Sequence, residues 1–273
     1  MTAATPQPDL RAIKGRQQVT WSSGEYARVG NTILFIAELL CESVDVRAGQ
    51  QVLDVATGNG NAALAAARRF CEVTGIDYAP TLLADGRKRA EAEGLPVDFR
   101  EGDAEALPCP DASFDVVLST VGAMFAPDQA AVARELLRVC RPGGKIGMAN
   151  WTPEGFIGAL FRTTGQHMPP PAGLPSAMRW GDEAAVRDLF GDGVSDLRME
   201  RRICVQRFPS PAFYVDFFRR YYGPTLKAFE ALDAAGQERL AADLDALLRA
   251  HNRSGDDTLV LHSEYLELVA TRR

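Results

Sequence analysis

The chain has 273 residues, a length that favours one domain carrying an insertion or a cap. Its composition, with 46% hydrophobic and 24% charged residues, excludes a disordered chain, a collagen-like fibre and a disulfide scaffold. A formal net charge of -6 has the wrong sign for a protein whose main task is to bind nucleic acid or an anionic membrane surface, so we expect neither partner.

The location of the protein is predicted from what the sequence lacks. The longest apolar stretch, around residues 32–40, contains Glu38 and is far shorter than the roughly 20 residues that a membrane span needs. No apolar run precedes a small-residue cleavage site at the amino terminus, so we expect a cytoplasmic protein. The cysteines are scattered and form no CxxC pair, which predicts buried thiols and argues against disulfides and a zinc site. They are Cys41, Cys71, Cys109, Cys140 and Cys204.

The first half of the chain predicts a layered sheet. A helix is expected at about residues 31–43, after the segment WSSGEY. From residue 51 onward, short β-branched runs alternate with longer helical stretches, which is typical of a parallel sheet covered on both faces. The expected strands are 51–55, 72–77, 97–101, 114–119 and 145–150, and the expected helices between them are 61–70, 80–93 and 128–140. This alternation predicts a doubly wound α/β sheet.

The second half predicts two more strands and a helical insertion. Residues 166–175 are rich in proline and glycine, so the chain is expected to leave the sheet there. Strands near 197–205 and 259–271 would complete seven strands, and the helical stretch between them resembles a cap. The predicted division is an amino-terminal segment and helix that cover the bound ligand (1–50), a ligand-binding core (51–205), a helical cap insertion (206–256) and a final strand that returns to the core (257–273).

The most informative segment is VLDVATGNGN, residues 52–61, where a strand leads through a glycine-containing turn into a helix. Glycines let the backbone approach a ligand closely at the carboxyl end of the first strand, where open α/β sheets bind nucleotides. This turn by itself fits a dinucleotide-binding oxidoreductase, or a tight turn with no ligand, equally well.

Further features follow successive strands and therefore share one edge of the sheet. Asp77 ends the second strand, where a carboxylate can accept both hydroxyls of a ribose. The segment GDAEALP follows the third strand and offers a side-chain oxygen and a backbone N–H to an adenine edge. The fourth strand, 114–119, would form the floor of the pocket. A solvated acid at a strand end remains the alternative for Asp77 alone.

These segments carry a resemblance to a known family. VLDVATGNGN, GIDYAP, EGDAEALPCPDASFDVVLS and ELLRVCRPGGKIGMANW, in this order and spacing, resemble the successive motifs of class I S-adenosylmethionine-dependent methyltransferases. The nearest branch is the small-molecule type, similar to ubiquinone and menaquinone biosynthesis enzymes (methyltransferase type 11). The resemblance covers about residues 51–151. It implies a Rossmann-like sheet, S-adenosylmethionine as cofactor, and methyl transfer to an O, C or N atom of a small, partly apolar acceptor of phenolic, quinone or polyketide-like type.

The resemblance also implies roles for individual residues. It assigns the turn after the first strand to the methionine moiety of the cofactor, and the residues of this turn are Asp54, Ala56, Thr57, Gly58 and Gly60. It assigns Asp77 to the ribose, Tyr78 to an adenine face, Asp103 and Ala104 to the adenine edge, and Ser119 to the pocket floor.

The turn departs from the family pattern at two positions. The family usually has glycine where this chain has Ala56, and threonine or serine where it has Asn59. Alanine is accepted if its φ is negative, so we expect cofactor binding with slight crowding. The segment RPGG, residues 141–144, matches the turn that leads into the fifth strand.

Two other functions remain as alternatives. A nicotinamide-binding unit usually has a third glycine three residues after Gly60, where this chain has Ala63, so an NAD(P)-dependent oxidoreductase is the weaker hypothesis. A protein that binds S-adenosylmethionine without turnover would keep the same residues and is the other alternative.

Candidate catalytic groups are few. His167 is expected in a loop over the pocket mouth, as a substrate-side base or hydrogen-bond donor, with an exposed loop histidine as the alternative. His251 is expected to cap a helix and His262 to be structural. No histidine pair has the spacing of zinc or iron ligands, so no metal is predicted.

Aromatic residues outside the core supply candidates for the substrate side. Trp21 and Tyr26 are expected either to contact the cofactor's charged sulfur or to pin their segment to the sheet. In the cap, one helical face carries Phe213, Phe217 and Tyr221, and the next carries Tyr214, Phe218 and Tyr222. One face is expected to line the acceptor pocket, for which we select Tyr214 and Phe218, with Trp180 and Met168 contributing; core packing of both faces is the alternative. The sequence does not predict an oligomeric state.

Overall fold

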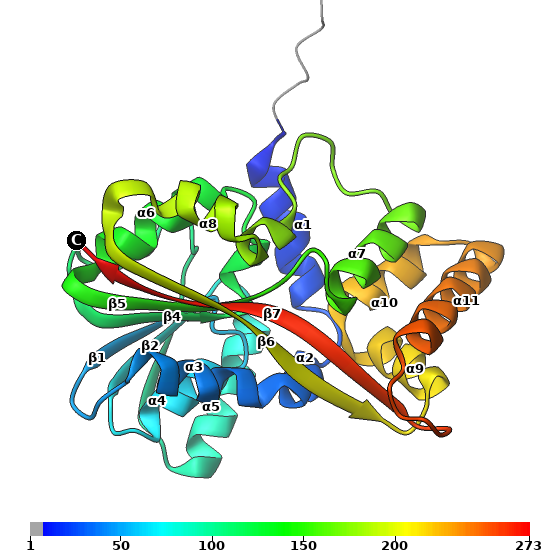
Figure 1. The fold of residues 1–273 in the computed structure, drawn as a ribbon, viewed down its shortest axis with the longest axis horizontal. Helices are drawn as coiled ribbons and strands as arrows, with labels where there is room; N and C mark the ends of the chain where they lie inside the picture. Colours follow the sequence, from blue (N-terminus) through cyan, green and yellow to red (C-terminus); the bar gives the residue numbers. More distant parts are fainter. Residues whose placement is uncertain (1–7) are drawn as a thin grey trace, which may run out of the picture.

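The protein, described by a computed structural model for residues 8–273, is built on a seven-stranded sheet (Figure 1). The strands are β1 (Gln51–Val55), β2 (Glu72–Asp77), β3 (Val97–Glu101), β4 (Phe114–Thr120), β5 (Cys140–Trp151), β6 (Val194–Phe208) and β7 (Leu259–Arg272). Their order is β3-β2-β1-β4-β5-β7-β6, in which the first five strands run parallel and β7 runs antiparallel to β5 and β6. The predicted seven-stranded, doubly wound Rossmann-like sheet is therefore confirmed.

Helices cover the sheet and extend beyond it. The α-helices are α1 (Leu10–Trp21), α2 (Tyr26–Gly30), α3 (Leu34–Val44), α4 (Asn61–Ala67), α5 (Pro80–Glu93), α6 (Gln129–Val139), α7 (Phe156–His167), α8 (Glu183–Phe190), α9 (Pro211–Tyr221), α10 (Gly223–Ala231) and α11 (Ala234–His251). Short 3-10 helices are η1 (Asn31–Ile33), η2 (Ala123–Phe125), η3 (Ala177–Gly181) and η4 (Gly191–Gly193).

The two faces of the sheet bury separate apolar layers. Helices α3, α4 and α5 lie on one face, and α6 and α8 lie on the other (Figure 1). Successive side chains of a strand point to opposite faces, so Val116 and Leu118 join the layer under α3 and α4 while Val117 joins the opposite layer. Because both faces are buried, the parallel strands read as nearly continuous apolar runs, which is why their positions were predictable.

The ends of several elements differ from the prediction. No helix is predicted before residue 22, but Leu10–Trp21 form α1, which a period analysis misses because Ile13 is its one buried residue. The helix expected at 61–70 ends at Ala67. The segment RPGG was expected as a turn and instead forms an irregularity within β5, opposite Asp115. A Cβ on Gly144 would lie 2.8 Å from the Asp115 carbonyl oxygen, so only glycine fits there.

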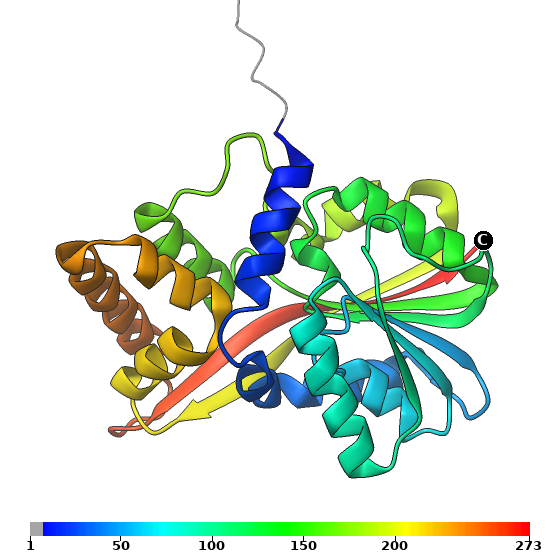
Figure 2. The same ribbon diagram turned by 180° about the vertical axis from the view of Figure 1, so that it is seen from behind.

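The last two strands connect the sheet to a separate group of helices. Strands β6 and β7 pair along almost their whole length and run out from the sheet toward α7, α9, α10 and α11 (Figure 1). Helix α1 crosses between this group and the sheet, as the view from behind shows (Figure 2). The described helices between β6 and β7 fall within residues 206–256, the range predicted as a cap. The predicted boundaries at residues 50, 205 and 256 stay a prediction, and residues 1–7 of the amino-terminal segment lie outside the described part of the chain.

Candidate functional site

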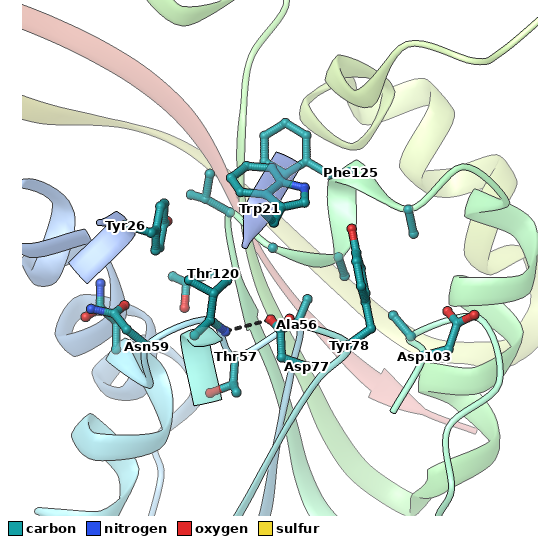
Figure 3. A pocket seen from close by; sticks show the side chains of 18 of the residues that line it. Trp21, Tyr26, Ala56, Thr57, Asn59, Asp77, Tyr78, Asp103, Thr120 and Phe125 are labelled. Carbon is teal, nitrogen blue, oxygen red and sulfur yellow. Dashed lines mark hydrogen bonds between the residues drawn. The ribbon is translucent and has the colours of Figure 1, made fainter. Parts of the chain in front are cut away.

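The carboxyl ends of the parallel strands surround a cavity, which we call the donor pocket (Figure 3). It encloses about 810 Å³, part of it open to solvent. Loops after β1, β2, β3 and β4 form its base, while α1, α2 and η1 close it from the other side. Its lining residues include Lys14, Trp21, Tyr26, Ala56, Thr57, Gly58, Asn59, Asp77, Tyr78, Asp103, Ala104, Thr120, Val121, Gly122 and Phe125.

A buried carboxylate fixes the turn after β1. Asp54 accepts hydrogen bonds from the Thr57 hydroxyl at 2.6 Å and from the Ala63 amide, in the first turn of α4, at 2.9 Å. Burial raises the pKa of the Asp54 carboxyl to about 7, while these two donors oppose the shift. Asp54 lies behind the turn and does not line the pocket, so its role toward the methionine moiety is indirect.

The expectation of a negative φ at Ala56 is wrong. Its φ is +54°, in the left-handed region that disfavours a side chain. The neighbouring Val121 is also left-handed, with φ +51°, and Gly122 packs so closely that a Cβ there would lie 2.3 Å from the Ala56 carbonyl oxygen. The loops after β1 and β4 thus hold each other in strained conformations, as is common at binding sites.

Asp77 is held in place at the end of β2. One of its oxygens accepts a hydrogen bond from the Gly58 amide at 2.8 Å, drawn in Figure 3, and the other accepts from the Ala79 amide at 2.9 Å. The side chain is buried, and this burial raises the pKa of the carboxyl while the amides oppose the shift. Each carboxylate oxygen has a second lone pair, so Asp77 can still accept two hydrogen bonds from a ligand.

The predicted adenine side is closed by α1. Tyr78, Asp103 and Ala104 line the pocket together (Figure 3). The Lys14 ammonium group lies 2.6 Å from Asp103 Oδ2 and 2.8 Å from Glu105 Oε2. Helix α1 is thereby tied across the pocket.

Two predicted residues support the pocket without lining it. Ser119 donates a hydrogen bond to the Val55 carbonyl at 2.8 Å and accepts one from the Ala123 amide at 3.0 Å, so it links β4 to β1. The floor expected at Ser119 is formed by Thr120, Val121 and Gly122 instead. Gly60 caps α4 with φ +87°, and a Cβ there would lie 2.9 Å from the Phe99 ring. These positions are fixed by packing beneath the pocket.

A second cavity adjoins the first, and we call it the acceptor chamber. It encloses about 490 Å³, part of it open to solvent. Both cavities are lined by Trp21, Tyr26, Ile33, Val121 and Phe125, so these residues stand between them. The remaining lining residues of the chamber are Val29, Thr32, Trp151, Ile157, Leu160, Phe161, Gln206, Tyr214, Phe218 and Tyr222.

The cap helix α9 presents its two aromatic faces differently. Tyr214 and Phe218 are buried and line the chamber together with Tyr222. On the other face Phe213 is 43% exposed, and the Tyr221 ring lies under the Arg28 guanidinium at 4.7 Å. The face of Tyr214 and Phe218 is therefore fully buried, whereas on the other face Phe213 is exposed and Phe217 and Tyr221 are only partly buried against the core.

His167 does not lie at either cavity. It ends helix α7, and its Nε2 lies 2.7 Å from Asp243 Oδ2 of α11. Helix α7 packs against α11 and ends at His167, so the expected loop begins only after this residue. Nothing in this position supports a role as catalytic base.

The other secondary candidates also lie away from the cavities. Met168 is 37% exposed, and Trp180 is buried against Phe190. The His251 ring packs against Phe156 at the end of α11, and His262 is exposed on β7. All five cysteines are buried and free, as predicted. Within residues 8–273 no group of side chains has the arrangement of a metal site, and none of the helices is long and apolar enough to cross a membrane.

The donor pocket fits S-adenosylmethionine better than a dinucleotide. Its charged lining residues are Lys14, Asp77 and Asp103, and Lys14 is already paired with acids. This acidic balance suits a sulfonium cation and opposes a pyrophosphate. Asn59, which is buried and lines the pocket, has an amide nitrogen without a hydrogen-bond partner among the described residues. That N–H donor suits the carboxylate of an amino acid.

Comparisons with known proteins agree with this geometry. Residues 52–144 match the model of a family described as "Methyltransferase domain". An uncharacterized protein of Mycobacterium tuberculosis is 40% identical over the full length of both chains. A demethylmenaquinone methyltransferase of Thermus thermophilus is 41% identical over 128 residues, which are 45% of this chain and 58% of that protein. The crystal structure of YcgJ from Bacillus subtilis superposes with a TM-score of 0.63 at 20% identity, covering 87% of this chain and 97% of the other.

Fold, pocket and family match together define a Rossmann-like transferase that uses S-adenosylmethionine as its cofactor. Residues 52–144 carry a methyltransferase domain, and the protein is an S-adenosylmethionine-dependent methyltransferase, as its motifs indicated. The oxidoreductase hypothesis is not supported by any of these findings.

Proposed function

We propose that the protein transfers a methyl group from S-adenosylmethionine to an O, C or N atom of a small, partly apolar molecule held in the acceptor chamber. The observation that carries this proposal is the wall of five residues common to the donor pocket and the chamber. A molecule in the chamber would lie next to the donor, and such adjacency is what an in-line displacement needs.

The donor would be held by side chains and backbone of the strand ends. These residues are Tyr26, Ala56, Thr57, Gly58, Asn59, Asp77, Tyr78, Asp103 and Ala104. When bound, S-adenosylmethionine supplies a methyl group already activated by a positively charged sulfur. Asp77 would accept the ribose hydroxyls with the lone pairs that Gly58 and Ala79 leave free. Helix α1 would cover the site and exclude water, because Lys14 ties it to Asp103.

The alignment of the methyl donor and the acceptor is proposed as the main source of the rate enhancement. None of the residues lining the chamber is an aspartate, glutamate, lysine, arginine or histidine. Holding two reactants in the correct geometry is worth about 7 to 11 kcal/mol, so a methyl transfer can proceed without a side-chain base. The acceptor would then release its proton to water.

Trp21 and Tyr26 form part of the wall next to the donor. Their rings meet edge to face with centroids 5.9 Å apart, and Trp21 also packs against Phe125 and Tyr222. Burial and the nearby Asp77 carboxylate raise the pKa of Tyr26 to about 12, so its ring stays uncharged at neutral pH. An uncharged aromatic wall would stabilise a cation beside it by about 1 kcal/mol.

Several observations support a small molecule as the acceptor. The formal charge of -6 disfavours nucleic acid, whose phosphates dominate its binding to proteins. The similar protein of Thermus thermophilus is named a demethylmenaquinone methyltransferase, which favours a ring-containing acceptor for this chain too. Five free, buried thiols suit a reducing compartment, and the same proposal places the enzyme in the cytoplasm.

Calorimetric titration of the purified, cofactor-stripped protein tests the first half of the proposal. S-adenosylmethionine and S-adenosylhomocysteine should bind, whereas NAD and NADP should not. The second half is tested by incubation with methyl-labelled donor and a panel of phenols, quinones and polyketide-like molecules. Label on a panel member supports the proposal. Donor binding without transfer to any of them would favour a protein that binds S-adenosylmethionine without turnover.

A further inference from the structure

One polar group in the acceptor chamber has no partner. Tyr214 lines the chamber and is 2% exposed, and its hydroxyl makes no hydrogen bond to the described residues. Leaving a buried hydroxyl unpaired costs about 1 to 3 kcal/mol, so such a group in a cavity wall suggests a ligand atom that completes it.

The ring that carries this hydroxyl is held firmly. It stacks on Phe218 at 4.1 Å and meets the edges of Phe208 at 4.9 Å and Phe156 at 6.3 Å, measured between ring centroids. Contacts on several sides leave the ring little freedom to turn its hydroxyl toward a protein acceptor. The hydroxyl of Tyr214 is therefore held at a fixed position, preorganised for a ligand atom.

The other polar side chains at this end of the chamber already satisfy one another. Gln206 donates to the Thr32 hydroxyl at 3.2 Å, and its amide oxygen accepts from Ser263 at 2.8 Å. Thr32 in turn donates to the Val29 carbonyl at 2.8 Å. Among the described residues that line the chamber, Tyr214 is the one whose buried polar atom lacks a hydrogen-bond partner, so we take it as the group that a ligand oxygen would satisfy.

The electrostatics of the chamber restrict the charge of the ligand. No side chain that lines it carries a charge at neutral pH, and most are aromatic or aliphatic. Burial raises the pKa of the Tyr214 hydroxyl, so it remains a neutral donor. A carboxylate or ammonium group would lose its hydration there without an opposite charge to replace it.

We propose that the acceptor chamber selects an uncharged, ring-shaped molecule bearing one hydrogen-bonding oxygen, and that the hydroxyl of Tyr214 is the group that recognises this oxygen. The inference rests on the proposed function, because it names the class of acceptor for the same site. Tyr214 acts here as a specificity-determining residue and takes no part in moving a proton.

Three ligands that share a naphthalene ring separate shape from polarity and charge. The probes are 2-naphthol, 2-methylnaphthalene and 2-naphthoate, each measured by equilibrium dialysis with S-adenosylhomocysteine present. The wild-type protein should bind 2-naphthol about tenfold more tightly than 2-methylnaphthalene, the effect of one good hydrogen bond to a preorganised group. It should bind 2-naphthoate at least about tenfold more weakly than 2-naphthol, because of the unpaired charge.

Two conservative variants make the test specific to the chamber. Tyr214→Phe should reduce the preference for 2-naphthol over 2-methylnaphthalene to within about twofold. Tyr265→Phe is the matched control, since Tyr265 is 1% exposed and its hydroxyl is also unpaired among the described residues, but it does not line the chamber. This control should keep the tenfold preference, and both variants should bind S-adenosylhomocysteine like the wild type.

The outcomes distinguish the two proposals. If S-adenosylhomocysteine binds but the wild type prefers 2-naphthoate, or binds none of the probes, the inference about Tyr214 is overturned while donor binding stands. A preference that survives in Tyr214→Phe, or that disappears equally in Tyr265→Phe, also overturns it. Failure of S-adenosylhomocysteine itself to bind would instead contradict the proposed function.

Discussion

The donor pocket and the acceptor chamber adjoin each other but differ in polarity and in the groups that form their walls. At the donor pocket, the buried carboxylates of Asp77 in its wall and of Asp54 behind it accept hydrogen bonds from backbone amides, and the backbone is strained at Ala56 and Val121. In the acceptor chamber the wall is mostly apolar and uncharged, and the buried hydroxyl of Tyr214 has no partner among the described residues. A fixed polar pocket suits one invariant cofactor, whereas an apolar chamber selects by shape and a single hydrogen bond.

Replacing Asp77 should produce the largest effect on ligand affinity, and it should be confined to the donor pocket. Asp77→Ala removes the acceptor of two ligand hydroxyls, so the dissociation constant for S-adenosylhomocysteine should rise by at least about 30-fold. Calorimetric titration measures it. Asp98→Ala serves as control, since this exposed acid of β3 pairs with Arg100 away from the pocket. Unchanged donor affinity in Asp77→Ala would contradict the ribose-binding role.

The pH dependence of the free energy of unfolding should further distinguish the donor pocket from the acceptor chamber, because the chamber is lined by no carboxylate comparable to Asp54. Its folded-state pKa of about 7 exceeds the usual value of 3.8, so the protonated form is favoured by folding. This stabilisation is complete below the usual pKa and is lost as the pH rises through about 7. In Asp54→Asn the loss should disappear, and the variant should gain stability over the wild type by up to about 4 kcal/mol between about pH 4 and pH 8.

Chemical denaturation at several pH values measures this difference. The asparagine side chain of the Asp54→Asn variant keeps an oxygen that can accept from Thr57 and Ala63, so the turn should persist. A difference between variant and wild type that stays constant with pH would show that the Asp54 pKa is not raised.

Relief of backbone strain is the next effect in size. Ala56→Gly places glycine at φ +54° and should stabilise the fold by about 1 kcal/mol, since the left-handed region penalises a Cβ. The control Ala66→Gly lies inside α4, where the same substitution should destabilise by about 1 kcal/mol or more. Thermal denaturation compares them, and equal signs for the two changes would argue against strain at Ala56.

The smallest effect is expected at His167, the candidate base that the structure places outside both cavities. His167→Gln loses a hydrogen bond to the exposed carboxylate of Asp243, which is worth about 1 kcal/mol of stability. The turnover number for any acceptor found in the panel should change less than about twofold, because the transfer is proposed to depend on positioning. A large loss of turnover with unchanged donor affinity would restore His167 as a catalytic group.

The cap aromatics show where sequence reasoning reached its limit. Helical spacing separated Tyr214 and Phe218 from Phe213 and Tyr221, and the structure buries the first face fully and the second only in part. Spacing did not say which face would point inward, because periodicity defines faces but not their neighbours. Lys14 was missed for a similar reason, since its partners Asp103 and Glu105 lie far along the chain, beyond the third strand.

The sequence by itself determined the sheet, the family and the strand ends that carry the donor pocket. These features depend on local signals: apolar strands, a glycine turn, and acids placed directly after strands, all of which act over a few residues. Only the tertiary structure decided that Asp54, Gly60 and Ser119 support the pocket from behind, that α1 covers it, and that Tyr214 faces a chamber without a partner among the described residues. Those outcomes depend on packing between distant segments, and a packing contact leaves no pattern in the order of residues along the chain.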